Sequence, residues 1–262
     1  MLLLGATLLG LAHVGPPRPA AAPITMHYRI ETKTEQTVDL SGFGQPNQVV
    51  NLGIVSWISV TLNDTTGGRV LHVVADSLKY DGGVPQLTQA SVDSARGGTI
   101  HAFIDGKGHL QNIVTRPEEN AFLADVQGVI HSFFPKVRAG VQAGDSWIDT
   151  VEVKNNQNGS KITSKFTISY TAGERSAISG VQALKLNSKS SATMSGTAQN
   201  PMGGTMEVEG TIAGSSESFI GADGRYLGGS ASSTANQVFK VSMAPSPIPV
   251  KTLRTVSVNM IP

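Results

Sequence analysis

Runs of residues in which apolar and polar side chains alternate constrain the fold of this chain more than any other feature. Within residues 161–170 all the apolar residues, Ile162 and Phe166 among them, have even numbers, and the odd positions carry Lys, Thr and Ser. Residues 48–63 and 205–212 place their main apolar residues on one parity in the same way. Successive side chains of a β-strand point to opposite faces, so each run predicts a strand with one buried face.

Short turn sequences separate these runs and set the fold class. Asp81-Gly82, Asp105-Gly106, Asn158-Gly159 and Asp223-Gly224 supply the positive φ angles that tight hairpins require. Beyond residue 22 the chain has 40 Val and Ile against 12 Leu, a balance that favours strands over helices. The sequence therefore predicts a mainly β fold, a large antiparallel curved sheet of about twelve strands, clam-like or barrel-like in shape.

Composition excludes several classes of function. The 262 residues include no Cys, which removes disulfide scaffolds, Cys-containing zinc sites, thiol catalysis and a lipidated cysteine. The formal net charge is +1, so there is no electrostatic reason to expect nucleic acid or acidic lipid as a partner.

The N-terminal residues indicate export. An apolar stretch fills the first fourteen residues, and prolines and the small residues Ala20 to Ala22 follow it. This stretch is shorter than the roughly 20 residues of a spanning helix, so residues 1–22 are interpreted as a signal peptide. A buried N-terminal element is the alternative. No later segment predicts a transmembrane helix, and we expect a periplasmic or extracellular protein.

One segment breaks the β pattern and predicts an amphipathic helix. Its apolar residues recur at spacings of three and four, which is typical of one helical face. Thr115 and Glu118 fit a capping box that would begin the helix, and Pro135 lies at its far end. The stripe would plug one open face of the sheet or form a lid over a ligand cavity. It consists of Phe122, Val126, Val129, Ile130 and Phe133.

This helix divides the chain into two strand-rich parts. The expected organisation is a first β half at 23–115, a linking helix at 116–136 and a second β half at 137–262. Residues 103–110 resemble residues 219–227, and Gly-Gly-Thr precedes both. Two similar β halves joined by one helix, produced by duplication, would explain the likeness. Independent use of similar hairpin sequences would explain it as well.

After the helix, residues 141–147 read Val-Gln-Ala-Gly-Asp-Ser-Trp. This VxxGDSW pattern resembles a mid-chain motif of uncharacterised exported bacterial β-rich proteins. The resemblance implies an envelope location and β structure, and it carries over no functional residue. From the residues themselves, Gly144-Asp145 predicts a turn, Ser146 a bond to local backbone, and Trp147 a large core side chain that starts a strand.

Known catalytic motifs are missing from the sequence. It has no His-Glu-x-x-His, no Gly-x-Ser-x-Gly, and neither of the common nucleotide-binding glycine motifs. His101 and His109 flank the Asp105-Gly106 turn, but a two-residue loop would pair His101 with Asn112, so no metal site is expected there. Asp105, Asp145 and Asp223 lie in turns where local hydrogen bonding explains them. We therefore expect no catalytic residue, no metal and no cofactor, and a protein that is not an enzyme.

The remaining expectation is a binding function. A large curved sheet with an amphipathic helix could enclose an apolar cavity, which predicts an exported carrier for a lipid-like or apolar ligand. The alternative is a structural or protein-interaction protein of the envelope with no small-molecule ligand. An outer-membrane β-barrel and a hydrolase rank below both. The expected ligand-binding residues are Phe122, Val126, Ile130 and Phe133 on the helix and Trp57 and Trp147 on strands.

Overall fold

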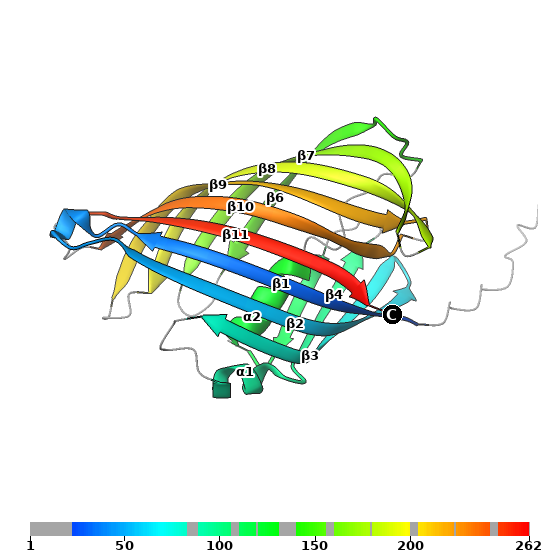
Figure 1. The fold of residues 1–262 in the computed structure, drawn as a ribbon, viewed down its shortest axis with the longest axis horizontal. Coiled ribbons are helices and arrows are strands. Elements are labelled where there is room, and N and C mark those ends of the chain that lie inside the picture. Colours follow the sequence, from blue (N-terminus) through cyan, green and yellow to red (C-terminus); the bar gives the residue numbers. More distant parts are fainter. Residues whose placement is uncertain are drawn as a thin grey trace, which may run out of the picture.

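A computed structural model shows one large antiparallel sheet of eleven strands that is curved and unclosed (Figure 1). It describes residues 23–82, 89–105, 110–118, 120–130, 140–155, 160–178, 180–199, 204–222, 224–241 and 246–261. The predicted fold class is confirmed, with eleven strands in place of about twelve. The elements in chain order are β1 (Ile24–Val38), η1 (Ser41–Phe43), β2 (Gln48–Thr65), β3 (Gly68–Gly82), α1 (Gln89–Ala95), β4 (Thr99–Asp105), β5 (Leu110–Arg116), α2 (Ala121–Ile130), β6 (Ser146–Asn155), β7 (Lys161–Ile178), β8 (Val181–Gln199), β9 (Thr205–Gly221), β10 (Tyr226–Val241) and β11 (Ile248–Ile261).

The order of the strands follows from hairpins and one long-range pairing. Across the sheet the order is β5-β4-β3-β2-β1-β11-β10-β9-β8-β7-β6, so adjacent strands are consecutive in sequence except for the central pair, β1 and β11. There β1 pairs with β11, with His27 opposite Ile261 and Val38 opposite Val250. Strands β5 and β6 form the two edges. The two similar sequences of the suggested duplication occupy non-equivalent positions in the sheet, because the β4–β5 pair is at an edge and the β9–β10 pair is in the interior of the strand order.

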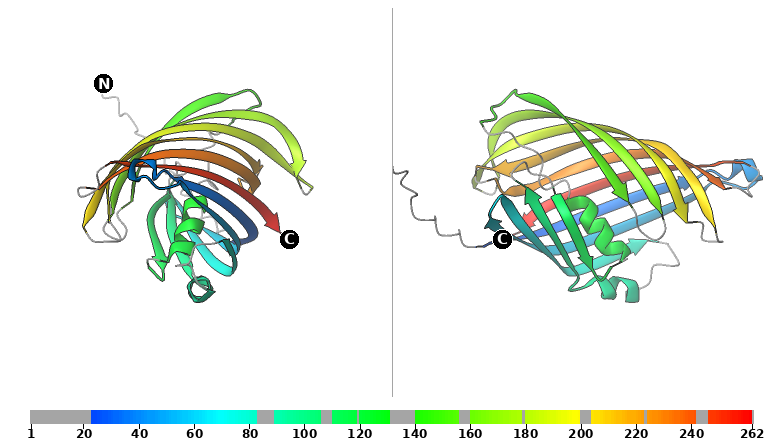
Figure 2. Two further views of the ribbon diagram at one scale, coloured as in Figure 1. Left: turned by 60° about the vertical axis from the view of Figure 1, so that its left-hand side comes forward. Right: turned by 180° about the vertical axis from the view of Figure 1, so that it is seen from behind.

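The sheet arches over α2, which lies against its inner side (Figure 2). We call the side that carries α2 the concave face and the opposite side the outer face. On β1 the even-numbered residues Tyr28 and Ile30 are buried on the concave face, whereas Arg29 and Glu31 on the outer face stay partly exposed. The alternating runs predicted at 48–63, 161–170 and 205–212 lie in β2, β7 and β9, and each places its even-numbered apolar residues on the concave face.

Helix α2 begins later than the sequence suggests. Asn120 is its N-cap, and its Oδ1 accepts the backbone N–H groups of Phe122 (3.0 Å) and Leu123 (3.2 Å). The predicted capping box is wrong, because Thr115 belongs to β5 and donates its hydroxyl to Gln127 Oε1 at 2.8 Å. The short helix α1 was not predicted, and it packs near the start of α2. In the described part of the chain, neither helix has the length and apolar character needed to cross a membrane.

The main core lies between α2 and strands β1–β4, and it extends to one end of β9, β10 and β11. Buried side chains of β1, β2, β3 and β4 pack there with Val126, Val129 and Ile130 of α2, and the same cluster contains Ile220, Tyr226 and Val258. A second cluster joins Phe122 and Leu123 to α1 and to the far ends of β2 and β3. The buried apolar side chains of α2 pack against these strands, and these contacts hold the helix against the concave face.

Candidate ligand-binding face

Three of the expected ligand-binding residues fix α2 in place. Phe122, Val126 and Ile130 are each at most 2% exposed, and they fill the space between the helix and the β1–β4 half of the sheet. In this half the helix acts as the predicted plug. The space directly beneath α2 is occupied by protein side chains, so a ligand needs another part of the concave face.

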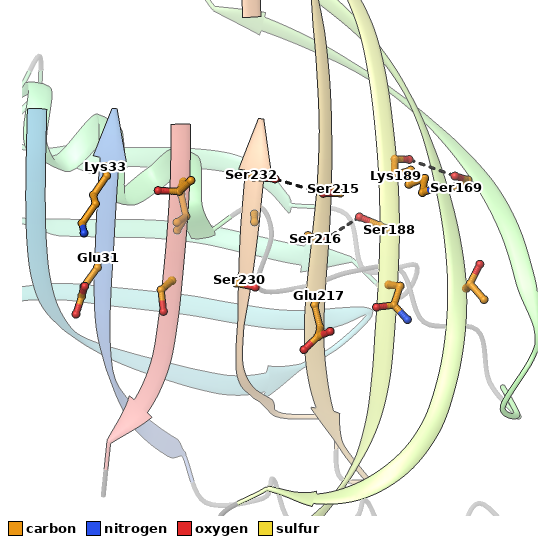
Figure 3. A pocket seen from close by; sticks show the side chains of 16 residues that line it. Glu31, Lys33, Ser169, Ser188, Lys189, Ser215, Ser216, Glu217, Ser230 and Ser232 are labelled. Atoms are coloured by element: carbon orange, nitrogen blue, oxygen red, sulfur yellow. Dashed lines mark hydrogen bonds between the residues drawn. The ribbon is translucent and has the colours of Figure 1, made fainter. Parts of the chain in front are cut away.

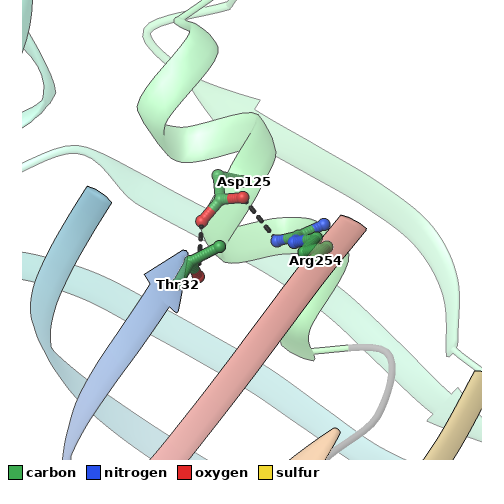
Figure 4. Close-up of polar contacts among 3 residues, drawn as sticks. All are labelled: Thr32, Asp125 and Arg254. Carbon is green, nitrogen blue, oxygen red and sulfur yellow. Dashed lines mark hydrogen bonds and ion pairs between the residues drawn. The ribbon is translucent and has the colours of Figure 1, made fainter. Parts of the chain in front are cut away.

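A polar contact fixes the side of α2 that faces the centre of the arch (Figure 4). The Asp125 carboxylate accepts a hydrogen bond from the Thr32 hydroxyl of β1 at 3.2 Å and pairs with the Arg254 guanidinium of β11. Burial raises the pKa of Asp125 above its usual value, although Arg254 and Thr32 act in the opposite direction. The helix is therefore tied to the two central strands by a largely buried charge.

The other half of the concave face, formed by β6–β10, carries apolar side chains that remain partly exposed. On β7 these are Phe166, Ile168 and Tyr170, and Ile212 on β9 and Phe239 on β10 continue the surface. They share the concave side with α2, because strand pairing leads from Ile168 through one residue each of β8, β9 and β10 to Arg254. Apolar surface is thus left available on a face that lies inside the arch.

Small side chains cross the middle of this half. Two adjacent rows run over β8, β9 and β10, and Ser188 and Ser216 join within one row by a hydrogen bond of 2.8 Å. The row ends are large residues, Ile168 and Tyr170 on β7 and Arg254 on β11. The six residues, here called the small-residue band, are Ser188, Ser190, Gly214, Ser216, Ala231 and Ser233. Because its side chains are short, the band leaves more room above the sheet than the surfaces beside it.

Trp147 closes one end of this surface, and the turn before it sets its position. Gly144 adopts a φ of +91°, and its N–H donates to Ala172 O at 2.8 Å, while Asp145 Oδ2 accepts the N–H of Gln142 at 2.9 Å. The predicted turn and strand start are confirmed, but Ser146 bonds the Thr171 hydroxyl and not local backbone.

Trp147 itself is 6% exposed and stacks on Tyr170, with ring centroids 5.3 Å apart. Its buried indole Nε1 has no hydrogen-bond partner among the described residues. Burial and the nearby Asp149 carboxylate raise the pKa of Tyr170. Trp147 is therefore part of a buried cluster with Ala172, Leu184 and Leu186, and Tyr170 packs against this cluster.

The remaining predicted site residues lie elsewhere. Trp57 points to the outer face, where Arg29 and Lys79 lie over its ring at 5.8 and 5.5 Å from the centroid. It therefore does not share a surface with Trp147 or with the α2 residues. Phe133 lies outside the described residues. Phe166, Ile168 and Tyr170 are not among the ligand contacts expected from the sequence, although the alternation in 161–170 places them on one face.

The outer face carries a groove of about 880 Å³ across the middle of six strands (Figure 3). Hydroxyl groups dominate its lining, among them those of Ser215 and Ser232, which lie 3.3 Å apart. Glu31 and Glu217 lie on one side of it, and both are paired with cations outside the lining: Glu31 with Arg29, and Glu217 with Lys185 at 2.6 Å. Most of its lining residues are Ser or Thr, and Ser188, Ser216 and Ala231 of the small-residue band are among the lining residues.

The sequence matches no model of a known protein family. The comparison with curated proteins gives no match either. The geometry of the two faces of the sheet is therefore the basis on which a function is assigned.

Proposed function

We propose that this protein is an exported, non-catalytic carrier that binds a lipid-like or other apolar molecule on the concave face of β6–β10. The observation that carries the proposal is the set of partly exposed apolar side chains of β7, β9 and β10 inside the arch. Ligand sites are concave and mainly apolar, with few polar groups that fix orientation. The apolar N-terminal sequence supports export, although residues 1–22 lie outside the described residues.

The expected binding position is the small-residue band. An elongated apolar molecule lying there would contact Phe166, Ile168 and Tyr170 on one side and the outer surface of α2 on the other. Helix α2, held by its buried residues and by Asp125, would form the fixed wall of the site.

The two tryptophans provide a direct test, because they lie on opposite faces of the sheet. A brominated fatty acid, which quenches only nearby indoles, would be titrated into Trp57→Phe, which keeps Trp147, and into Trp147→Phe, which keeps Trp57. We expect saturable quenching of Trp147 and none beyond free-solution collisions for Trp57. Equal quenching of the two, or none of either, would contradict the proposal. Organic extracts of gently purified protein, analysed by mass spectrometry, would identify a natural ligand.

The alternative is an envelope protein that binds other proteins through its outer face and holds no small molecule. The hydroxyl-lined groove supports it, because Ser and Thr on neighbouring strands offer many hydrogen-bonding groups. A protein whose extracts contain no ligand, and in which Trp147 is not quenched, would favour this alternative. The two candidate functions therefore use opposite faces of the sheet and are separated by one experiment.

A further inference from the structure

Two histidines on the outer face lie directly opposite each other on neighbouring strands. His72 of β3 pairs with His101 of β4. Their Nδ1 atoms are 3.3 Å apart, the ring centroids are 4.4 Å apart, and the ring planes are inclined by 38°. Strand β3 lies between β2 and β4, so the position of His72 is fixed by pairing on both sides.

A separation of 3.3 Å between two ring nitrogens requires a proton or a metal cation between them. Two unprotonated nitrogens would direct their lone pairs at each other, and two protonated ones would direct their N–H groups at each other. A shared proton satisfies the pair, and so does a metal ion. Two imidazole nitrogens at about 2.0–2.1 Å from one tetrahedral Zn²⁺ lie about 3.3–3.4 Å apart. The observed separation is the one that a single ion would need.

The side chains that surround the pair are mostly uncharged. Described charged groups on this face are Arg116, which pairs with Thr99 on β4, Asp76, which bonds Ser59 at 2.6 Å, and Asp105 on β4, whose carboxylate accepts a hydrogen bond from Gln111 at 2.9 Å. The immediate neighbours on the outer face are uncharged, namely Thr61, Val70, Val74, Thr99, Phe103 and Val114.

We propose that His72 and His101 form a two-histidine site for a divalent transition metal ion such as Zn²⁺, with both Nδ1 atoms as ligands. No group of three metal-ligating side chains occurs among the described residues, so water would complete the coordination. Imidazole suits Zn²⁺, Cu²⁺ and Ni²⁺, and a site with only two protein ligands exchanges its ion readily. The site is on the outer face and does not rest on the proposed binding of an apolar molecule.

The test is a Zn²⁺ titration of the full chain by isothermal calorimetry at neutral pH. The variants His72→Gln and His101→Gln each keep a polar side chain of similar size and remove one ligand. We expect each to weaken Zn²⁺ binding by about tenfold or more, because two-point attachment is lost. The control is His27→Gln, a histidine on the same face whose Nδ1 lies 3.0 Å from Ser59 Oγ, and it should leave the affinity unchanged. Circular dichroism would verify that all three variants fold.

A second measurement locates the ion on the rings. Long-range ¹H–¹⁵N spectra should show Zn²⁺ shifting the Nδ1 signals of both His72 and His101 while both Nε2 atoms stay protonated. Binding should weaken at mildly acidic pH, since protons compete for the ligand nitrogens. Absence of Zn²⁺ binding by the wild-type chain, or binding that survives both substitutions, would overturn the proposal and leave a shared proton as the explanation of the pair.

Discussion

The start of helix α2 gives the sharpest prediction about stability. Asn120→Ala removes the Oδ1 acceptor of two N–H groups, those of Phe122 and Leu123, and also the Nδ2 donor that reaches Ser94 Oγ at 3.0 Å. Loss of an N-cap side chain costs about 1 kcal/mol, and a further hydrogen bond of the neutral type about 0.5–1.5 kcal/mol. We expect unfolding free energy to fall by about 1.5–2.5 kcal/mol and Tm by about 3–10 °C for a chain of this size.

The matched control is Glu118→Gln, which removes the acidic residue of the capping box that the sequence suggested. Glu118 is exposed and lies before the helix, so this change should stay within about 0.5 kcal/mol. Urea unfolding would measure both free energies, and hydrogen exchange at the amides of Phe122 and Leu123 would show whether the loss is local. A larger effect of Glu118→Gln than of Asn120→Ala would refute the assignment of the cap.

Three further predictions concern the concave face and the core. Phe166→Asp should weaken binding of a brominated fatty acid by about tenfold or more, because it places a charge in the apolar surface. The control Thr167→Asp, on the outer face of the same strand, should leave binding unchanged. Fluorescence titrations would measure both variants, and an equal loss of binding would count against the proposed site. The raised pKa of Asp125 means that the folded state holds this proton more tightly than the unfolded state, so its contribution to stability is complete below the ordinary carboxylate range and is lost as pH rises through the raised pKa. Urea unfolding at several pH values should therefore show wild type gaining stability on acidification relative to Asp125→Asn, and the opposite slope would contradict the burial argument. Tyr28→Phe removes a buried hydrogen bond of 2.8 Å to Tyr226 O, and calorimetric unfolding should show a loss of about 1–3 kcal/mol, whereas no change would mean that the carbonyl finds another donor.

Local patterns predicted the strands well because alternation is a property of each strand by itself. The runs in β2, β7 and β9 carry their own evidence of which residues share a face. The same rule assigns Trp57 to the outer face, since its odd number separates it from the apolar residues of β2 that have even numbers. The odd–even alternation of this strand therefore excludes Trp57 from the concave face, and this could have been concluded from the sequence alone.

Other features depend on contacts between distant segments. The pair His72 and His101 requires the register of β3 against β4, which is set across a connection that includes α1. A two-residue loop would pair His101 with Asn112, but the register already differs by one residue next to the turn, where Ile104 lies opposite Leu110. A bulge, at which Asn112 has a φ of +52°, adds a second residue, so His101 lies opposite Val114. A single extra residue in β5 changes every partner beyond it. The sheet order, with β1 against β11, is equally invisible to local rules.

Partly exposed apolar side chains on the concave face of β7 favour the proposed binding of a ligand over a purely structural role. Ala192 and Met194 of β8 are at most 8% exposed, so the fold can bury side chains on this face of the sheet. Phe166 and Ile168 on the adjacent strand are larger, yet they stay partly exposed at the same level of the sheet. Each Å² of apolar surface left in water forgoes about 25 cal/mol of stabilisation. An apolar molecule lying on the small-residue band would cover this surface, and the free energy that the fold leaves unused would then become binding energy.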